Sequence, residues 1–148
     1  MTIPIPQIKK SRREKEILDI PKILIVEDEE PLLRYLVDEL MRYSCIVLYA
    51  LDGKEGLELA QKEYPDMIVL DLLMPIMDGM TMLKKLRESD DLYVQDVPVL
   101  ILTNVVDSPI LTQGELSKFG VVDYLIKNDR NIKRTVDIVK EKFSVSLL

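Results

Sequence analysis

The chain has 148 residues, of which 47% are apolar and 31% charged, with a formal net charge of −6 and no histidine. This length is enough for one domain with a buried core, and the acidic balance argues against a nucleic-acid-binding surface, which would carry a basic stripe. Without histidine, His-based catalytic triads and His metal ligands are excluded. Any metal must be bound by oxygen, which favours hard cations such as Mg²⁺ or Mn²⁺.

Cysteine usage and hydropathy indicate the compartment. Cys45 is the only cysteine, so no internal disulfide can form, which fits a reducing environment. No apolar run approaches membrane-spanning length, and the N-terminus lacks a signal-peptide core. We therefore expect a cytoplasmic protein that does not insert into membranes.

Residues 1–20 differ in composition from the rest and are predicted to be an extension that precedes one domain over residues 21–148. Ser11 and Glu14 have the spacing of a capping box, which favours a short helix from Arg12 to Leu18. A solvated leader explains the basic run equally well, because acidic residues interrupt it. That run comprises Lys9, Lys10, Arg12, Arg13 and Lys15.

From residue 21 onward, short apolar runs alternate with segments of helical spacing. In chain order the pattern predicts a strand at 23–26, a helix at 31–43, a strand at 45–50, a helix at 53–64, a strand at 67–70, a helix at 80–89, a strand at 97–102, a helix at 108–119, a strand at 122–126 and a helix at 132–143. Runs without polar alternation are typical of strands that helices cover on both faces. The fold class is therefore α/β, a doubly wound five-stranded parallel sheet with five helices.

Polar residues interrupt this pattern where the predicted strands end. Glu27 and Asp28 follow the first strand, Asp71 the third, Thr103 the fourth and Lys127 the fifth. The carboxyl ends of parallel strands share one edge of the sheet, where ligands of open α/β sheets bind. No G-x-G-x-x-G or Walker loop is present, so a nucleotide-binding fold is not favoured.

These residue types together favour metal-assisted phosphoryl chemistry. Three adjacent carboxylates repel one another, and a divalent cation relieves that repulsion. Asp28 and Asp71 are the best candidate ligands, with Glu27 binding directly or through a water. A carboxylate can also act as the nucleophile, which makes Asp71 the candidate phosphoacceptor. Lys127 would then neutralise the phosphoryl group, and Thr103 would donate a hydrogen bond to it.

Several segments resemble the receiver domain of bacterial response regulators, over about residues 22–143. Each is weak alone, but their order and spacing are specific. They are Ile23-Leu24-Ile25-Val26-Glu27-Asp28-Glu29, Val69-Leu70-Asp71-Leu72-Leu73-Met74-Pro75 with Asp78-Gly79, Ile101-Leu102-Thr103, and Asp123-Tyr124-Leu125-Ile126-Lys127.

The resemblance implies a flavodoxin-like sheet of order 2-1-3-4-5. It also implies that the Leu73 carbonyl completes the metal site and that Tyr124 is coupled to Thr103 as a switch. Such a domain is not a conventional enzyme, although it assists its own Mg²⁺-dependent phosphorylation and dephosphorylation. A sensor histidine kinase or histidine phosphotransfer protein would supply the phosphoryl group.

Three residues depart from the usual family pattern. Glu27 replaces the commoner aspartate, Asn104 stands where a small residue usually follows the threonine, and Asn128 replaces the proline after Lys127. Because a cis bond before a non-proline residue costs about 2.5–4 kcal/mol, we predict a trans Lys127–Asn128 bond. Asn104 is expected to narrow the pocket, and the neighbouring Val105 is apolar like Leu73.

Two rival functions remain at this point. A pseudo-receiver would only bind a partner, but all the pocket residues are present. A haloacid-dehalogenase-type phosphatase needs a second aspartate two residues after the nucleophile, where this chain has Leu73. We expect a single-domain regulator that signals through a downstream protein, and the sequence leaves homodimerisation open.

Overall fold

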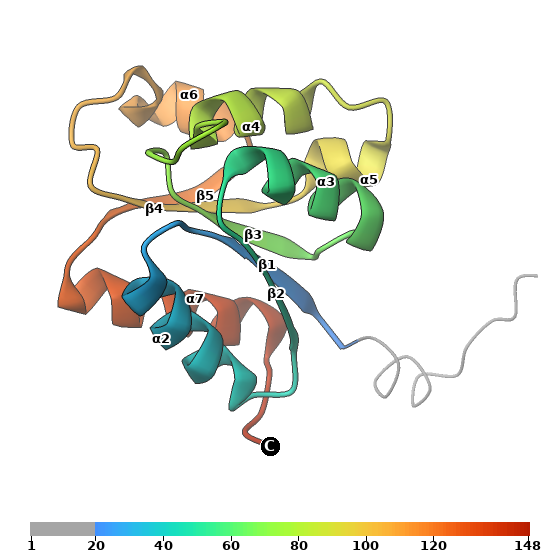
Figure 1. The fold of residues 1–148 in the computed structure, drawn as a ribbon, viewed down its shortest axis with the longest axis vertical. Coiled ribbons are helices and arrows are strands. Elements are labelled where there is room, and N and C mark those ends of the chain that lie inside the picture. Colours follow the sequence, from blue (N-terminus) through green and yellow to red (C-terminus); the bar gives the residue numbers. More distant parts are fainter. Residues whose placement is uncertain (1–19) are drawn as a thin grey trace, which may run out of the picture.

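A five-stranded parallel sheet lies between two layers of helices in the computed structural model, which describes residues 20–148 (Figure 1). Its strand order is β2-β1-β3-β4-β5, which confirms the predicted order 2-1-3-4-5. The five predicted strands are all present, with bounds that shift by up to two residues. They are β1 Lys22–Val26, β2 Ile46–Ala50, β3 Met67–Leu70, β4 Val99–Thr103 and β5 Val121–Ile126.

The helices divide between the two faces of the sheet. Helices α2 (Glu30–Met41) and α7 (Asp129–Phe143) cover one face, and α3 (Gly53–Glu63), α4 (Gly79–Arg87), α5 (Leu92–Asp96) and α6 (Gln113–Lys118) lie on the other (Figure 1). Alternate residues of β1 serve the two layers: Ile23 and Ile25 pack with α2 and α7, and Leu24 and Val26 with α3 and α4. Burial on both sides explains why the strands are continuously apolar.

The predicted number of helices was wrong, because residues 20–148 form six α-helices rather than five. Helix α5 was missed because five residues are too few to show a helical period. Its signal is local instead: Asp91 caps it by accepting hydrogen bonds from the Tyr93 and Val94 N–H groups, and Val94 is buried.

The helix predicted at 108–119 is in fact two pieces. Pro109–Leu111 form a 3₁₀ turn, and α6 begins only after Thr112. Thr112 has an extended backbone, and its hydroxyl accepts the Glu115 N–H, so it interrupts one helix and caps the next. Gly120 then ends the segment with a φ of 62°, a left-handed conformation that glycine adopts without steric cost.

The register of the strands brings their carboxyl ends to one level. Val26 pairs with Leu70 of β3, and Thr103 pairs with Ile126 of β5. The next residues, Glu27, Asp71 and Lys127, therefore leave the sheet at the same edge. This placement follows from strand pairing alone, before any side chain interacts.

Several smaller expectations can now be compared with the structure. The Lys127–Asn128 bond is trans, as predicted, since residues 20–148 contain no cis peptide bond. Asn128 instead caps α7, accepting the Asn131 N–H at 2.8 Å. No helix in the described part of the chain is long and apolar enough to span a membrane. The helix proposed for residues 12–18 lies outside the described residues.

Candidate functional site

Three carboxylates meet at the carboxyl edge of the sheet. Glu27 and Asp28 follow β1 and Asp71 follows β3, and one oxygen from each lies within 4.8 Å of the others. Glu27 and Asp71 are almost fully buried, with 2% and 3% of their surface exposed, whereas Asp28 is exposed. The cluster therefore has two buried members and one that faces solvent.

Lys127 provides the positive charge of this cluster. Its Nζ lies 2.9 Å from Asp71 Oδ2, 3.1 Å from both carboxylate oxygens of Glu27 and 2.9 Å from Glu29 Oε1. Burial alone would lower the pKa of Lys127, but the hydrogen bonds to Asp71 and Glu29 outweigh it and raise that pKa above its usual value. The ammonium is thus permanently charged at physiological pH.

Glu27 is the most strongly perturbed acid of the cluster. Burial raises its pKa to about 7, with a further contribution from the negative charge of Asp71. The Glu29 N–H, which donates to Glu27 Oε1 at 3.0 Å, and the Lys127 ammonium oppose that rise without cancelling it. The cluster therefore carries more acidic groups than one lysine can compensate, which is the electrostatic condition that favours a bound cation.

The loop after β3 fixes the position of Asp71. The Asp71 N–H donates to the Val26 carbonyl at 3.1 Å, and its Oδ1 accepts the Leu73 N–H at 3.2 Å. The start of α4 approaches closely, because a Cβ on Gly79 would overlap the Asp71 carbonyl oxygen. Glycine is required there so that the loop can close against the strand end.

Thr103 and Tyr124 both contact the backbone of Val105. The Thr103 hydroxyl is fully buried and accepts the Val105 N–H at 3.3 Å. The Tyr124 hydroxyl donates to the Val105 carbonyl at 2.6 Å, and burial raises the pKa of this phenol. One residue of the loop after β4 therefore links the two side chains.

The loops that follow Asp71 and Thr103 carry the residues expected to control access to the carboxylates. Leu73 is 63% exposed, and Asn104 is also exposed, while Val105 is half-buried. That Asn104 narrows the pocket stays a prediction. Leu73 and Val105 are both apolar, so neither side chain can hydrogen-bond a water near Asp71.

The donor set fits a hard divalent cation. The candidate ligands are oxygen atoms from Glu27, Asp28 and Asp71, within a few ångström of one another. Asp28 makes no hydrogen bond or ion pair within residues 20–148, so its carboxylate is available, whereas Glu27 is engaged by Lys127. Mg²⁺ and Mn²⁺ take such carboxylates together with waters and phosphoryl oxygens. Leu73, whose carbonyl is the remaining candidate ligand, lies two residues after Asp71 in the same loop.

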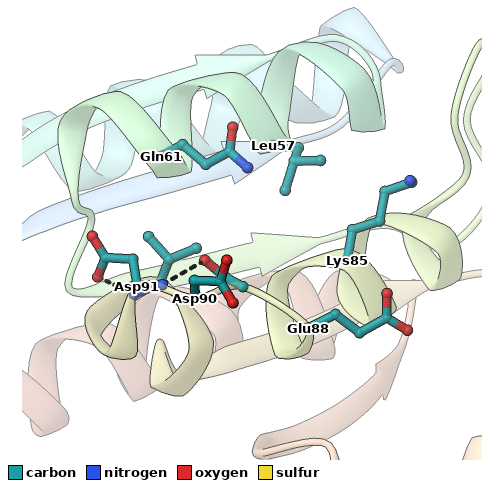
Figure 2. Close-up of a pocket in the computed structure, with 8 residues that line it drawn as sticks. Leu57, Gln61, Lys85, Glu88, Asp90 and Asp91 are labelled. Carbon is teal, nitrogen blue, oxygen red and sulfur yellow. Dashed lines mark hydrogen bonds between the residues drawn. The ribbon is translucent and has the colours of Figure 1, made fainter.

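A separate groove lies between α3, α4 and α5 and is distinct from this cluster. Figure 2 shows Leu57 and Gln61 on one side and Lys85, Glu88, Asp90 and Asp91 on the other. It shares no residue with the carboxylate cluster. The chemistry described above therefore does not extend into it.

Two features of the site were missed by sequence reasoning. Glu29 contacts Lys127, and its only signal was a third acid in the run from Glu27. Ile76, in the loop after Asp71, has a φ of 69° and is 81% exposed. A β-branched residue in the left-handed region is a backbone outlier, and composition gives no sign of it.

Comparison with known proteins identifies the family. The model of the response regulator receiver domain matches residues 23–138. Response regulator ArlR of Staphylococcus aureus is 36% identical over 106 residues, which cover 72% of this chain and 45% of ArlR. The chain spans less than half the length of the curated relatives it matches.

Solved structures of response regulators have the same fold as this chain. The receiver domain of Francisella response regulator 1452 is 30% identical, with a TM-score of 0.66 over 83% of this chain and 98% of that one. The phosphorylated cyanobacterial phytochrome response regulator RcpA is 25% identical, with a TM-score of 0.66 over 82% of this chain and 90% of its own. With its sheet order, its acidic edge and this family match, the chain belongs to the receiver domains of two-component response regulators.

Proposed function

We propose that Asp71 accepts a phosphoryl group and that the phosphorylated chain signals by binding another protein. One observation carries the proposal: Asp71 is buried at the sheet edge, with the Lys127 ammonium 2.9 Å from its Oδ2 and two further carboxylates beside it. A capping or structural aspartate would not need a lysine and two further acids beside it, brought from two other strands. The phosphorylated state of the similar protein RcpA supports the same role.

The reaction is a single group transfer. The phosphorus–nitrogen bond of a phosphohistidine, or the phosphorus–oxygen bond of an acyl phosphate, breaks as a bond forms between phosphorus and an Asp71 carboxylate oxygen. The imidazole or carboxylate of the donor leaves with the electron pair of the broken bond. Lys127 binds one phosphoryl oxygen, and Thr103 donates its hydroxyl to another.

A bound Mg²⁺ or Mn²⁺ would neutralise the carboxylates and the charge of the phosphoryl group. Asp28 and Asp71 would bind it together with the Leu73 carbonyl, and Glu27 would contribute directly or through a water. This assignment uses only oxygen ligands that leave the sheet at one edge. It also offsets the burial, and the smaller repulsion from Asp71, that raise the pKa of Glu27 to about 7.

The signal would pass from the phosphoryl group to Tyr124 through Val105. If the Thr103 hydroxyl turns toward a phosphoryl oxygen, it gives up the Val105 N–H, and the loop that accepts the Tyr124 hydroxyl is released. Tyr124 on β5 can then change position. A change at this edge strand alters the surface offered to a downstream protein.

We further propose a cellular setting. The donor is a sensor histidine kinase or a histidine phosphotransfer protein, and the chain works in the cytoplasm, where its single cysteine stays reduced. Residues 21–148 act as the receiver domain after an extension of residues 1–20. The groove that Glu29, Pro31 and Ile132 line between α2 and α7 offers a donor protein a hollow, and its Glu29 contacts Lys127.

The test is Mg²⁺-dependent labelling of the full chain by radiolabelled acetyl phosphate. We expect uptake of up to one phosphoryl group per chain, abolished by EDTA and removed by hydroxylamine, which cleaves acyl phosphates. Labelling that ignores Mg²⁺ or resists hydroxylamine would exclude an aspartyl phosphate. The phosphatase alternative would appear instead as phosphate release from small phosphoesters.

Mg²⁺ affinity should depend on Asp28 more than on Glu27. Asp28 is exposed and unengaged, whereas both Glu27 oxygens already lie 3.1 Å from the Lys127 ammonium. We expect Asp28→Ala to weaken Mg²⁺ binding by at least about tenfold and Glu27→Ala to weaken it less. Calorimetric titration with Mg²⁺ measures both, with Glu30→Ala as an exposed control, and equal or reversed losses would refute the order.

The phosphorylated form should be long-lived. Hydrolysis needs a water placed in line with the phosphorus, and the apolar Leu73 and Val105 cannot orient it. Leu73→Asn, which adds an amide at an exposed position, should speed loss of label several-fold. Asn104→Ala should have the smaller effect, because Asn104 faces solvent. If neither variant loses label faster than the native chain, the side chains at this entrance do not control the lifetime.

A further inference from the structure

Glu29 completes the hydrogen bonding of the Lys127 ammonium. An ammonium has three N–H groups, and here the three acceptors are the carboxylates of Glu27, Asp71 and Glu29. All three N–H directions are therefore occupied. A phosphoryl oxygen on Asp71 can be bound by Lys127 only if one of these contacts is given up.

The three contacts differ in what their loss would cost. Glu27 and Asp71 are 97–98% buried, so a carboxylate there that loses Lys127 loses a partner that water cannot replace. The Glu29 side chain is 53% exposed, so water can replace the ammonium. Glu29 is thus the acceptor whose release is least unfavourable.

Within residues 20–148, the Glu29 carboxylate makes no hydrogen bond or ion pair other than its contact with Lys127. Glu29 occupies the position that precedes α2, yet its carboxylate makes no capping hydrogen bond. The bonds at its backbone, from its N–H to Glu27 and from the Leu33 N–H to its carbonyl, do not need the side chain. The start of α2 therefore does not depend on the contact between the Glu29 carboxylate and Lys127.

We propose that Glu29 is a positioning residue that competes with the phosphoryl group for Lys127, holding the ammonium in the unphosphorylated chain and releasing it when Asp71 is occupied. The proposal rests on the phosphoacceptor role of Asp71. Glu29 thereby sets how readily the pocket accepts a phosphoryl group. Its removal should favour the occupied state.

The probe is beryllium fluoride, a non-covalent phosphoryl mimic, titrated into the full chain at saturating Mg²⁺. Glu29→Ala should bind it about fivefold more tightly than the native chain, the scale of one partly exposed ion pair. Glu29→Gln, whose amide is a weaker acceptor, should lie between them. The neighbouring Glu30→Ala removes the same charge without touching Lys127 and should change affinity by less than about twofold, because salt screens an exposed charge.

Glu29→Asp separates contact from charge. It keeps the carboxylate but shortens the arm, so it should also bind the mimic more tightly than the native chain. If Glu29→Ala gains nothing, or if Glu30→Ala gains as much, or if Glu29→Asp matches the native chain, Glu29 does not compete for Lys127. A native chain that neither binds the mimic nor takes label from acetyl phosphate would instead overturn the phosphoacceptor role, and the Glu29 proposal with it.

Discussion

Asp71→Asn is expected to reduce phosphoryl uptake from acetyl phosphate to background while the chain stays folded. The amide oxygen is a poor nucleophile, so no acyl phosphate can form at this position. Asparagine has nearly the same shape, and its oxygen can still accept the Leu73 N–H that now binds Asp71 Oδ1. Lys127 retains Glu27 and Glu29 as acceptors, so the free energy of unfolding should change by only about 1 kcal/mol.

Asp78→Asn is the matched control for this variant. Asp78 lies on the same loop, and its Oδ1 accepts the Thr81 N–H at 2.7 Å to cap α4. Asparagine caps helices about as well as aspartate, so this variant should be labelled like the native chain. Labelling of both variants measures phosphoryl uptake, and urea unfolding shows whether each variant stays folded. Undiminished label on Asp71→Asn would mean that another group is the acceptor.

The sheet and its polar edge could be predicted because each depends on one strong physical signal. A strand buried on both faces has no room for polar residues, so the apolar runs around Ile23 and Ile68 mark β1 and β3 without ambiguity. The first polar residue after such a run lies at the carboxyl edge of the sheet. Strand pairing then brings Glu27, Asp71 and Lys127 together, although up to 100 residues separate them.

Features that depend on a single contact could not be predicted. To predict the ion pair of Glu29 with Lys127, one must know in which direction the long Glu29 side chain extends. Sequence spacing gives no information about that direction. The exposure of Asn104 is of the same kind, since the direction of a loop side chain is set by the backbone around it. The division of residues 108–119 followed from the extended backbone of Thr112, a residue that can occupy helices as well as caps.

Arg87 gives the second large expected effect, and it too was invisible in the sequence. At the end of α4, its guanidinium donates to the carbonyls of Phe119 at 2.6 Å, Val97 at 2.7 Å and Gln95 at 2.8 Å. It therefore joins α4 to the end of α5 and to the turn that leads into β5. Burial lowers the pKa of Arg87, but an arginine stays charged in proteins, so all three are charge-assisted hydrogen bonds.

We expect Arg87→Met to lower the free energy of unfolding by about 3 kcal/mol, since the variant keeps the apolar stem but leaves three carbonyls without their donor. For a domain of this size the Tm should fall by roughly 10 °C. Arg87→Lys should recover little of the lost stability, because one compact ammonium cannot reproduce the planar fork that reaches three carbonyls at once.

Lys85→Met, on the exposed side of the same helix, should change stability by less than about 0.5 kcal/mol. Urea unfolding of the four proteins tests the order. If Arg87→Met and Lys85→Met lose the same small amount, water replaces the guanidinium at these carbonyls, and α4, α5 and the β5 turn are held together by their apolar contacts alone.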